Sequence, residues 1–167
     1  MRAAATGQHG PPLRLAFGLD GLAVAALVAY VVVTGGRGRQ DDGFFADPLP
    51  DGLAVLAFAA AIAAGAVAAW ALVREPPRTR AGRWAVGLAI AFVASLPVLG
   101  LLTEALGLEH GWAEAAVRPT ILLVSGFGAM VLGAVAHEPG RRGLLFIPLM
   151  IGASALLFFL GDLLFPQ

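Results

Sequence analysis

The three histidines are the first residues to test for chemistry, because imidazole binds haem iron and divalent metals. His9 and His110 lie in hydrophilic segments, and His137 lies at the end of an apolar one. Haem held between membrane helices needs paired histidines well inside them, and a metal site needs several ligands at suitable spacing. The chain has neither pattern, so we expect no cofactor and no metal site.

Hydrolysis is the second chemistry to test, since a serine becomes a nucleophile when a neighbouring base activates it. Ser95, Ser125 and Ser154 lie inside apolar segments, whereas the histidines lie only at segment edges or in loops. The chain has no cysteine and no lysine, which excludes disulfides, thiolate sites and Schiff-base catalysis. We therefore predict no catalytic residue and no enzyme, with each serine bonded to its own helix or packed at a helix contact.

Asp20 is the one acid well inside an apolar segment. A carboxylate in hydrocarbon is costly and often marks a route for protons or ions, so one hypothesis is an intramembrane ionisable site. The other hypothesis is that Asp20 lies close enough to the membrane surface to be hydrated or to pair with an arginine. The sequence leaves both hypotheses open.

The elements that hold these residues follow from the composition of the chain. Of its 167 residues, 59% are hydrophobic and 13% are charged, and the mean hydropathy is +0.83. Soluble domains carry about 25% charged residues, so the chain is predicted to be a membrane protein. Its formal net charge is zero, which gives no reason to expect nucleic acid as a partner.

Five apolar segments approach or exceed the roughly 20 residues that a helix needs to cross a bilayer. They predict an all-α, polytopic helical membrane protein with a single transmembrane domain over residues 13–167, preceded by a disordered cytoplasmic tail over residues 1–12. The first segment is expected to be an uncleaved signal anchor. The fourth is the shortest, and pairing it with the fifth in a tight hairpin would leave four spans. The segments cover about 13–34, 51–73, 84–106, 119–136 and 143–164.

The arginines predict the orientation of the chain. Eight of the 11 lie before the first segment, between the second and third, or between the fourth and fifth, which are regions on one side of a five-span chain. Because positive residues mark the cytoplasmic side, we expect the N-terminus to be cytoplasmic. These arginines are Arg2, Arg14, Arg74, Arg78, Arg80, Arg83, Arg141 and Arg142.

Small residues recur every four positions in two segments and predict helix contacts. Ala61, Gly65 and Ala69 form one such stripe, and Ala129 with Gly133 forms another. Small side chains let helix backbones approach closely, so both stripes are candidate contact surfaces for a partner. Two prolines, Pro97 and Pro148, lie inside the third and fifth segments, where each is expected to remove a backbone hydrogen bond and to favour a kink.

The order of these features resembles the small membrane subunit of tripartite tricarboxylate transporters, the TctB family. The resemblance rests on an outer loop with a Gly-Phe-Phe motif, on a Leu-Gly phrase that ends the third segment, and on the closing helix. In this sequence the three motifs are Asp42-Gly43-Phe44-Phe45-Ala46-Asp47-Pro48, Leu101-Leu102-Thr103-Glu104-Ala105-Leu106-Gly107-Leu108, and the run from Ala155 to Pro166.

The resemblance implies a non-catalytic subunit of the bacterial inner membrane, with the loop residues Gly43, Phe44 and Phe45 as candidate partner contacts. In such systems a large multi-span permease carries the translocation path, and a soluble extracytoplasmic protein captures citrate-like carboxylates. The implied partners are therefore the permease, the solute-binding protein through the complex, and the lipid bilayer. A structural accessory subunit of another membrane complex, such as a respiratory or photosynthetic assembly, would have the same composition and remains the alternative.

Overall fold

The computed structural model describes the backbone of residues 11–35, 48–106 and 112–164, and the side chains of residues 11–35, 49–95, 120–139 and 141–157. Within these ranges the chain is helical and contains no strand. The helices are α1 (Pro11–Thr34), α2 (Pro48–Arg74), α3 (Arg80–Leu106), α4 (Trp112–Val135), the 3-10 helix η1 (Pro139–Leu145) and α5 (Phe146–Leu164). The predicted all-α class is confirmed.

Local chemistry explains where several helices begin and end. Pro11 opens α1, in the first turn, where a missing N–H costs nothing. Gly35 follows the end of α1 with φ of 62°, a conformation that glycine adopts without a Cβ clash. The pair Pro76 and Pro77 follows α2, and a proline cannot continue a helix.

Four helix starts differ from the sequence predictions by three residues or more. Helices α2 and α3 begin at Pro48 and Arg80, before the predicted positions near 51 and 84. The fourth helix begins at Trp112 and not near residue 119, because the Ala- and Glu-containing stretch before Pro119 is polar enough to end an apolar run but favours helix. The fifth α-helix begins at Phe146 and not near residue 143, since η1 occupies the preceding seven residues.

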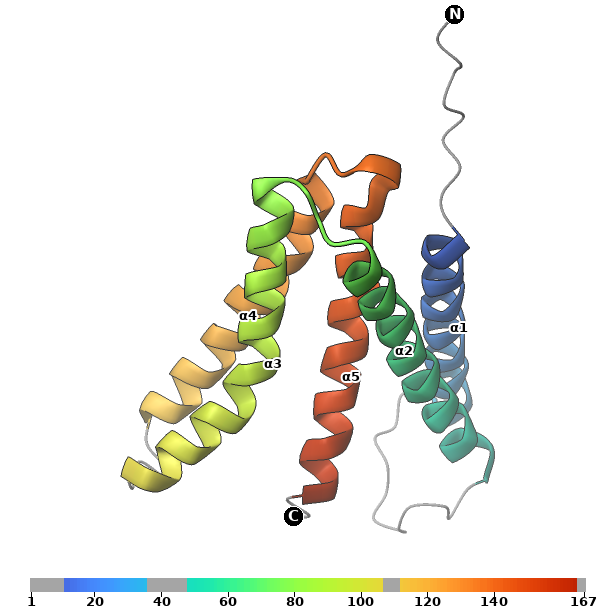
Figure 1. Ribbon diagram of the computed structural model, residues 1–167. Helices are drawn as coiled ribbons and strands as arrows, with labels where there is room; N and C mark the ends of the chain where they lie inside the picture. Colours follow the sequence, from blue (N-terminus) through green and yellow to red (C-terminus); the bar gives the residue numbers. More distant parts are fainter. Residues whose placement is uncertain (1–10, 36–47, 107–111, 165–167) are drawn as a thin grey trace, which may run out of the picture.

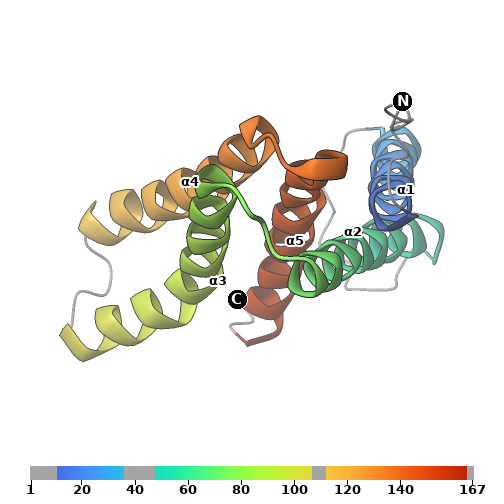
Figure 2. The same ribbon diagram turned by 45° about the horizontal axis from the view of Figure 1, so that its top comes forward.

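The two prolines also differ in their effects. Pro148 is the third residue of α5, close to the point where η1 passes into the α-helix and not in the helix interior. Pro97 lies in the second half of α3, where its missing N–H does interrupt the bonding ladder. Helix α3 bends along this half in both views (Figures 1 and 2), and proline is the usual cause of such a bend.

The helices form two antiparallel pairs joined by the fifth. Helix α1 packs along α2, and α3 packs along α4, while α5 lies between the pairs and contacts α2 most extensively. Figures 1 and 2 show the α3–α4 pair meeting α5 at one end and diverging from it toward the other. The two pairs are thus held together mainly by α5 and η1.

The main apolar core lies at the end where the pairs converge. Phe146 is fully buried and Met150 is 1% exposed, and both contact side chains from the other helices. Farther along α1 and α2 the buried apolar side chains are alanines, including Ala23, Ala60 and Ala61. Large side chains therefore fill the convergent end, whereas small ones bring the helices close elsewhere.

Among the residues that the structure describes, two helices are long and apolar enough to cross a membrane: Pro11–Thr34 and Leu49–Arg74. A core helix of a soluble protein would be mostly buried, but only 22% and 33% of the residues in their most apolar stretches are buried. A third apolar stretch, Thr120–Val135 in α4, is shorter.

Candidate functional site

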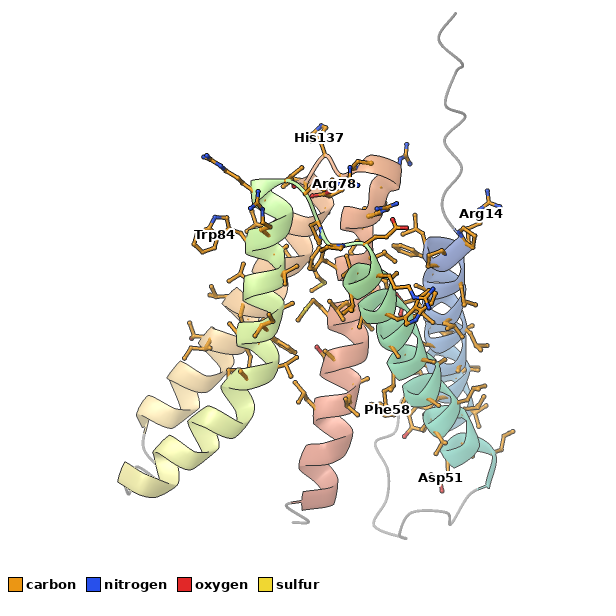
Figure 3. All side chains as sticks on the ribbon, viewed as in Figure 1. Arg14, Asp51, Phe58, Arg78, Trp84 and His137 are labelled. Atoms are coloured by element: carbon orange, nitrogen blue, oxygen red, sulfur yellow. The ribbon has the colours of Figure 1, made fainter. Side chains whose placement is uncertain are left out.

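The most polar part of the described chain is the convergent end of the helices. Arg14 lies near the start of α1, Arg78 precedes α3, and His137 follows α4, and Figure 3 shows all three side chains at this end. Trp84 lies nearby on α3, whereas Asp51 lies at the opposite end. We call this region the basic end. Its described residues include seven arginines and two acids: Arg14, Arg74, Arg78, Arg80, Arg83, Arg141 and Arg142, with Glu75 and Glu138.

Thr79 caps the N-terminus of α3 and also contacts another loop. Its hydroxyl oxygen accepts a hydrogen bond from the N–H of Gly82 at 3.0 Å, which is the geometry of a helix N-cap. The same hydroxyl donates to Glu138 Oε1 at 2.6 Å. Thr79 therefore joins the cap of its own helix to a residue that lies 59 positions later in the chain.

Glu138 completes this junction from the loop between α4 and η1. Its carboxylate also accepts the backbone N–H of Thr79 at 2.8 Å and that of Arg78 at 3.1 Å. The residue is only 7% exposed, and it brings a negative charge to the N-terminus of α3, where the helix dipole favours one. We refer to the contact of Glu138 with Arg78 and Thr79 as the carboxylate latch.

The latch determines the protonation of Glu138. Burial raises the pKa of the carboxyl, but hydrogen bonds from Thr79 and Arg78 and the positive charge of Arg142 together lower it by more, so the pKa lies below its ordinary value. The latch therefore holds its acid in the charged form that accepts all three hydrogen bonds.

Gly82 lets the latch close. A Cβ atom at this position would lie 2.5 Å from the Cβ of Pro77 and 2.6 Å from Oε1 of Glu138. No side chain fits there without moving the loop or the carboxylate.

The basic end also has two weaker contacts. Arg142 forms an ion pair with Glu75, with 40% and 55% of the two side chains exposed, so solvent screens much of the attraction. Arg74 stacks over the ring of Trp70, with 4.2 Å between the guanidinium carbon and the ring centroid.

The first predicted stripe of small residues, on α2, contacts another helix of the same chain. Gly65 faces Gly152 of α5, and a Cβ atom on Gly152 would come within 2.5 Å of the carbonyl oxygen of Ala61 and 2.6 Å of the Cα of Gly65. Ala61 is 6% exposed, and Ala69 is half-buried. We call this contact the glycine crossing.

The second stripe is covered in the same way. Ala129 is fully buried, and a Cβ atom on Gly133 would come within 2.5 Å of the ring of Phe146. The backbones also touch, since a side chain on Gly143 would collide with the carbonyl oxygen of Gly133. Helix α5 and η1 of the same chain therefore occupy the surfaces that the sequence offered to a partner.

Asp20 lies on the face of α1 that packs against α2. It is 8% exposed, and its Oδ1 atom is buried without a hydrogen-bond partner. The other buried side chains on this face of α1 are apolar: Leu13, Ala16, Ala23 and Ala26.

The serines bond within their own helices. Ser95 donates to the carbonyl of Phe92 at 2.7 Å, Ser125 to that of Ile121 at 2.6 Å, and Ser154 to that of Met150 at 2.8 Å. This is the local bonding that serine commonly adopts inside apolar helices.

The remaining predicted residues divide into two groups. Gly43, Phe44 and Phe45 lie outside the described residues, as do His9 and His110. His137 is exposed, and its Nδ1–H donates to the carbonyl of Val135 at 3.1 Å. Over the ranges that the structure describes, no three His, Asp or Glu side chains come together as metal ligands would.

The latch is the feature that sequence reasoning missed. A capping threonine after two prolines was a readable signal for the start of α3, but nothing local indicated that Glu138 would meet it.

Comparison of the chain with protein-family models, with curated proteins and with solved structures found no match.

Proposed function

We propose that the chain is a small, non-catalytic transmembrane subunit of a tripartite carboxylate transporter, in which it stabilises or assists the large permease. In this proposal all five α-helices span the bacterial inner membrane, and the N-terminus is cytoplasmic. The family assignment rests on the sequence resemblance to the TctB subunits.

The apolar surface of the helices is the observation that best supports a membrane subunit. Large apolar side chains stay exposed on described helices, among them Val32 at 73%, Leu123 at 69% and Ile90 at 64%. Water would penalise so much exposed apolar area at about 25 cal/mol per Å², whereas lipid or a partner helix would cover it at no such cost.

The basic end supports the proposed orientation. Its arginines lie at the ends of helices that carry apolar surfaces, and Trp70 and Trp84 are 51% and 71% exposed close to them. Exposed tryptophans at the headgroup level and arginines on the cytoplasmic side are typical of inner-membrane proteins.

The interior favours an assisting role over that of a self-sufficient carrier. The contacts of α2 with α1 and α5 are lined by alanine and glycine, and the described serines satisfy their hydroxyls locally. A translocation path for carboxylates needs polar groups directed toward a common route. In this proposal that route belongs to the permease.

We assign the permease contact to the outer face of α1. This helix packs chiefly against α2, and the part of its surface that α2 leaves uncovered exposes Val24 at 60% and Val28 at 56%. The stripes first considered for this role are already covered by α5 and η1.

The experiment has two parts. Deleting the gene should abolish carboxylate uptake, and the tagged chain should copurify with a large multi-span permease. A photo-crosslinker at Val28 should capture the permease, whereas one at Phe127 on α4 serves as the matched apolar control and should not. A stable monomer with no effect on uptake, or copurification with redox subunits or pigments, would overturn the proposal.

A further inference from the structure

A groove of about 600 Å³ lies at the basic end, where α4 leads into η1. Ala134, Val135 and Leu144 give it an apolar wall, and His137 and Arg141 line its polar part. Both polar side chains are exposed. The groove therefore combines positive charge with an apolar surface.

Arg141 occupies a backbone conformation that suits glycine better. Its φ is 57°, the one positive value for a residue other than glycine in the described ranges. A side chain makes this conformation costly, and a glycine would adopt it readily. An arginine at such a position indicates that its side chain has a role, because strained residues gather at functional sites.

The two described acids at this end have partners other than Arg141. Glu138 also borders the groove, but its oxygens already accept hydrogen bonds from Thr79 and Arg78. Glu75, the other acid at this end, pairs with Arg142. With seven arginines against two acids, the described residues of the basic end carry an excess of five positive charges. The ligand that this charge would attract is an anion.

An apolar stripe leads away from the groove along α4. Phe127, Val131 and Val135 are spaced four residues apart, so they share one helix face, and they are 65%, 42% and 57% exposed. Val135 belongs both to the groove and to the stripe. The anion expected in the groove is therefore one that carries a long apolar tail.

We propose that this groove binds the headgroup of an anionic phospholipid. The phosphate lies at Arg141, with His137 beside it, and one acyl chain lies along the stripe on α4. Arginine suits this role because its guanidinium donates paired hydrogen bonds to phosphate oxygens. The proposal rests on the membrane placement proposed above and does not depend on the transporter assignment.

The test uses the full chain in detergent micelles with fluorescent phosphatidylglycerol, phosphatidylcholine as the neutral lipid, and inorganic phosphate as a competitor. Binding is measured by anisotropy at about 1 M salt, where the Debye length is about 3 Å and diffuse attraction is screened. The variants are Arg141→Gln and Arg141→Gly. Arg80→Gln is the matched control, since it removes one charge from the basic end outside the groove.

Wild-type protein should prefer phosphatidylglycerol, and both Arg141 variants should weaken its binding by about tenfold, as expected for a lost charge-assisted pair. Arg80→Gln should retain the binding. Arg141→Gly should also melt at or above the wild-type temperature, because it relieves the strained backbone, so its loss of lipid cannot be attributed to unfolding.

Three results would overturn the proposal: no preference for the anionic lipid, equal losses in Arg80→Gln and Arg141→Gln, or displacement of the lipid by equimolar inorganic phosphate. Each would leave the proposed transporter role standing. A chain that fails to enter membranes at all would overturn both.

Discussion

The carboxylate latch and the glycine crossing join distant parts of the chain by opposite means. The latch links the α2–α3 connection to the α4–η1 connection, and the crossing links α2 to α5. The latch is polar, lies between two loops and depends on one buried charge with three donors. The crossing has no polar side chain, and it depends on the absence of side chains at Gly65 and Gly152. In lipid, apolar helices gain little by hiding from their solvent, so close packing and hydrogen bonds must supply the association. This chain uses packing along its helices and hydrogen bonds at their ends.

The largest effect is expected from breaking the glycine crossing with Gly152→Leu. The new side chain would collide with the backbone of α2, and we expect a loss of about 3 kcal/mol in the free energy of unfolding. Unfolding by titration with sodium dodecyl sulfate measures it. Gly87→Leu is the matched control, because nothing lies within 4 Å of a Cβ atom there, and it should be neutral or slightly stabilising. Equal effects at both positions would show that the crossing is not needed.

The second effect is expected from Glu138→Gln, which keeps the shape of the latch but removes its charge. The backbone N–H groups of Thr79 and Arg78 would lose a charged acceptor, at a cost of about 2 kcal/mol. The same unfolding titration measures the loss. Glu75→Gln is the control, because its ion pair is exposed and worth at most about 1 kcal/mol. If Glu75→Gln cost as much as Glu138→Gln, burial of the latch would not matter.

Replacement of Asp20 by an apolar residue is expected to stabilise the protein. It tests whether a buried polar group destabilises the apolar contact of α1 with α2. Asp20→Ala removes a buried, unpartnered oxygen from a face otherwise lined by Leu13 and alanines, and should raise the free energy of unfolding by about 1–2 kcal/mol. Asp20→Asn keeps a polar oxygen there and should gain less. A destabilised Asp20→Ala variant would mean that the carboxyl has a partner that stabilises the fold.

The smallest effect is a difference in pH dependence between the two contacts. Since the pKa of Glu138 in the folded protein lies below its ordinary value of 4.5, the latch contributes its full stability above that value. That contribution is lost as the pH falls below 4.5 and through the lower folded pKa. The melting temperature of wild-type protein should therefore fall more steeply with acid than that of Glu138→Gln, whereas Gly152→Leu should keep the wild-type slope. Parallel curves for wild type and Glu138→Gln would contradict the latch.

The contrast also shows which features could be predicted from the sequence. The helices were largely predictable, because long apolar runs depend only on residues close in the chain. The start of α4 was misplaced since hydropathy finds the apolar part of a helix and not its polar first turns. The helical environment likewise predicted the local bonding of Ser125.

For the contact between α2 and α5, the sequence predicted the surface on α2 but not the residue on α5 that packs against it. The stripe of Ala61 and Gly65 was visible, but in a chain so rich in alanine and glycine it does not select Gly152 as its neighbour. The meeting of Glu138 with Thr79 depends on where two loops end in space, and no periodicity carries that information. The sequence therefore predicted local structure but not which distant residues pair.

The position of α5 has a consequence for how the protein is made. It follows both pairs in the sequence, yet it lies between them and brings Phe146 and Met150, the largest of the most deeply buried side chains. Without it, the α1–α2 and α3–α4 pairs share few contacts and can form as separate hairpins. The two pairs are therefore joined only when α5 docks between them and Gly152 meets Gly65.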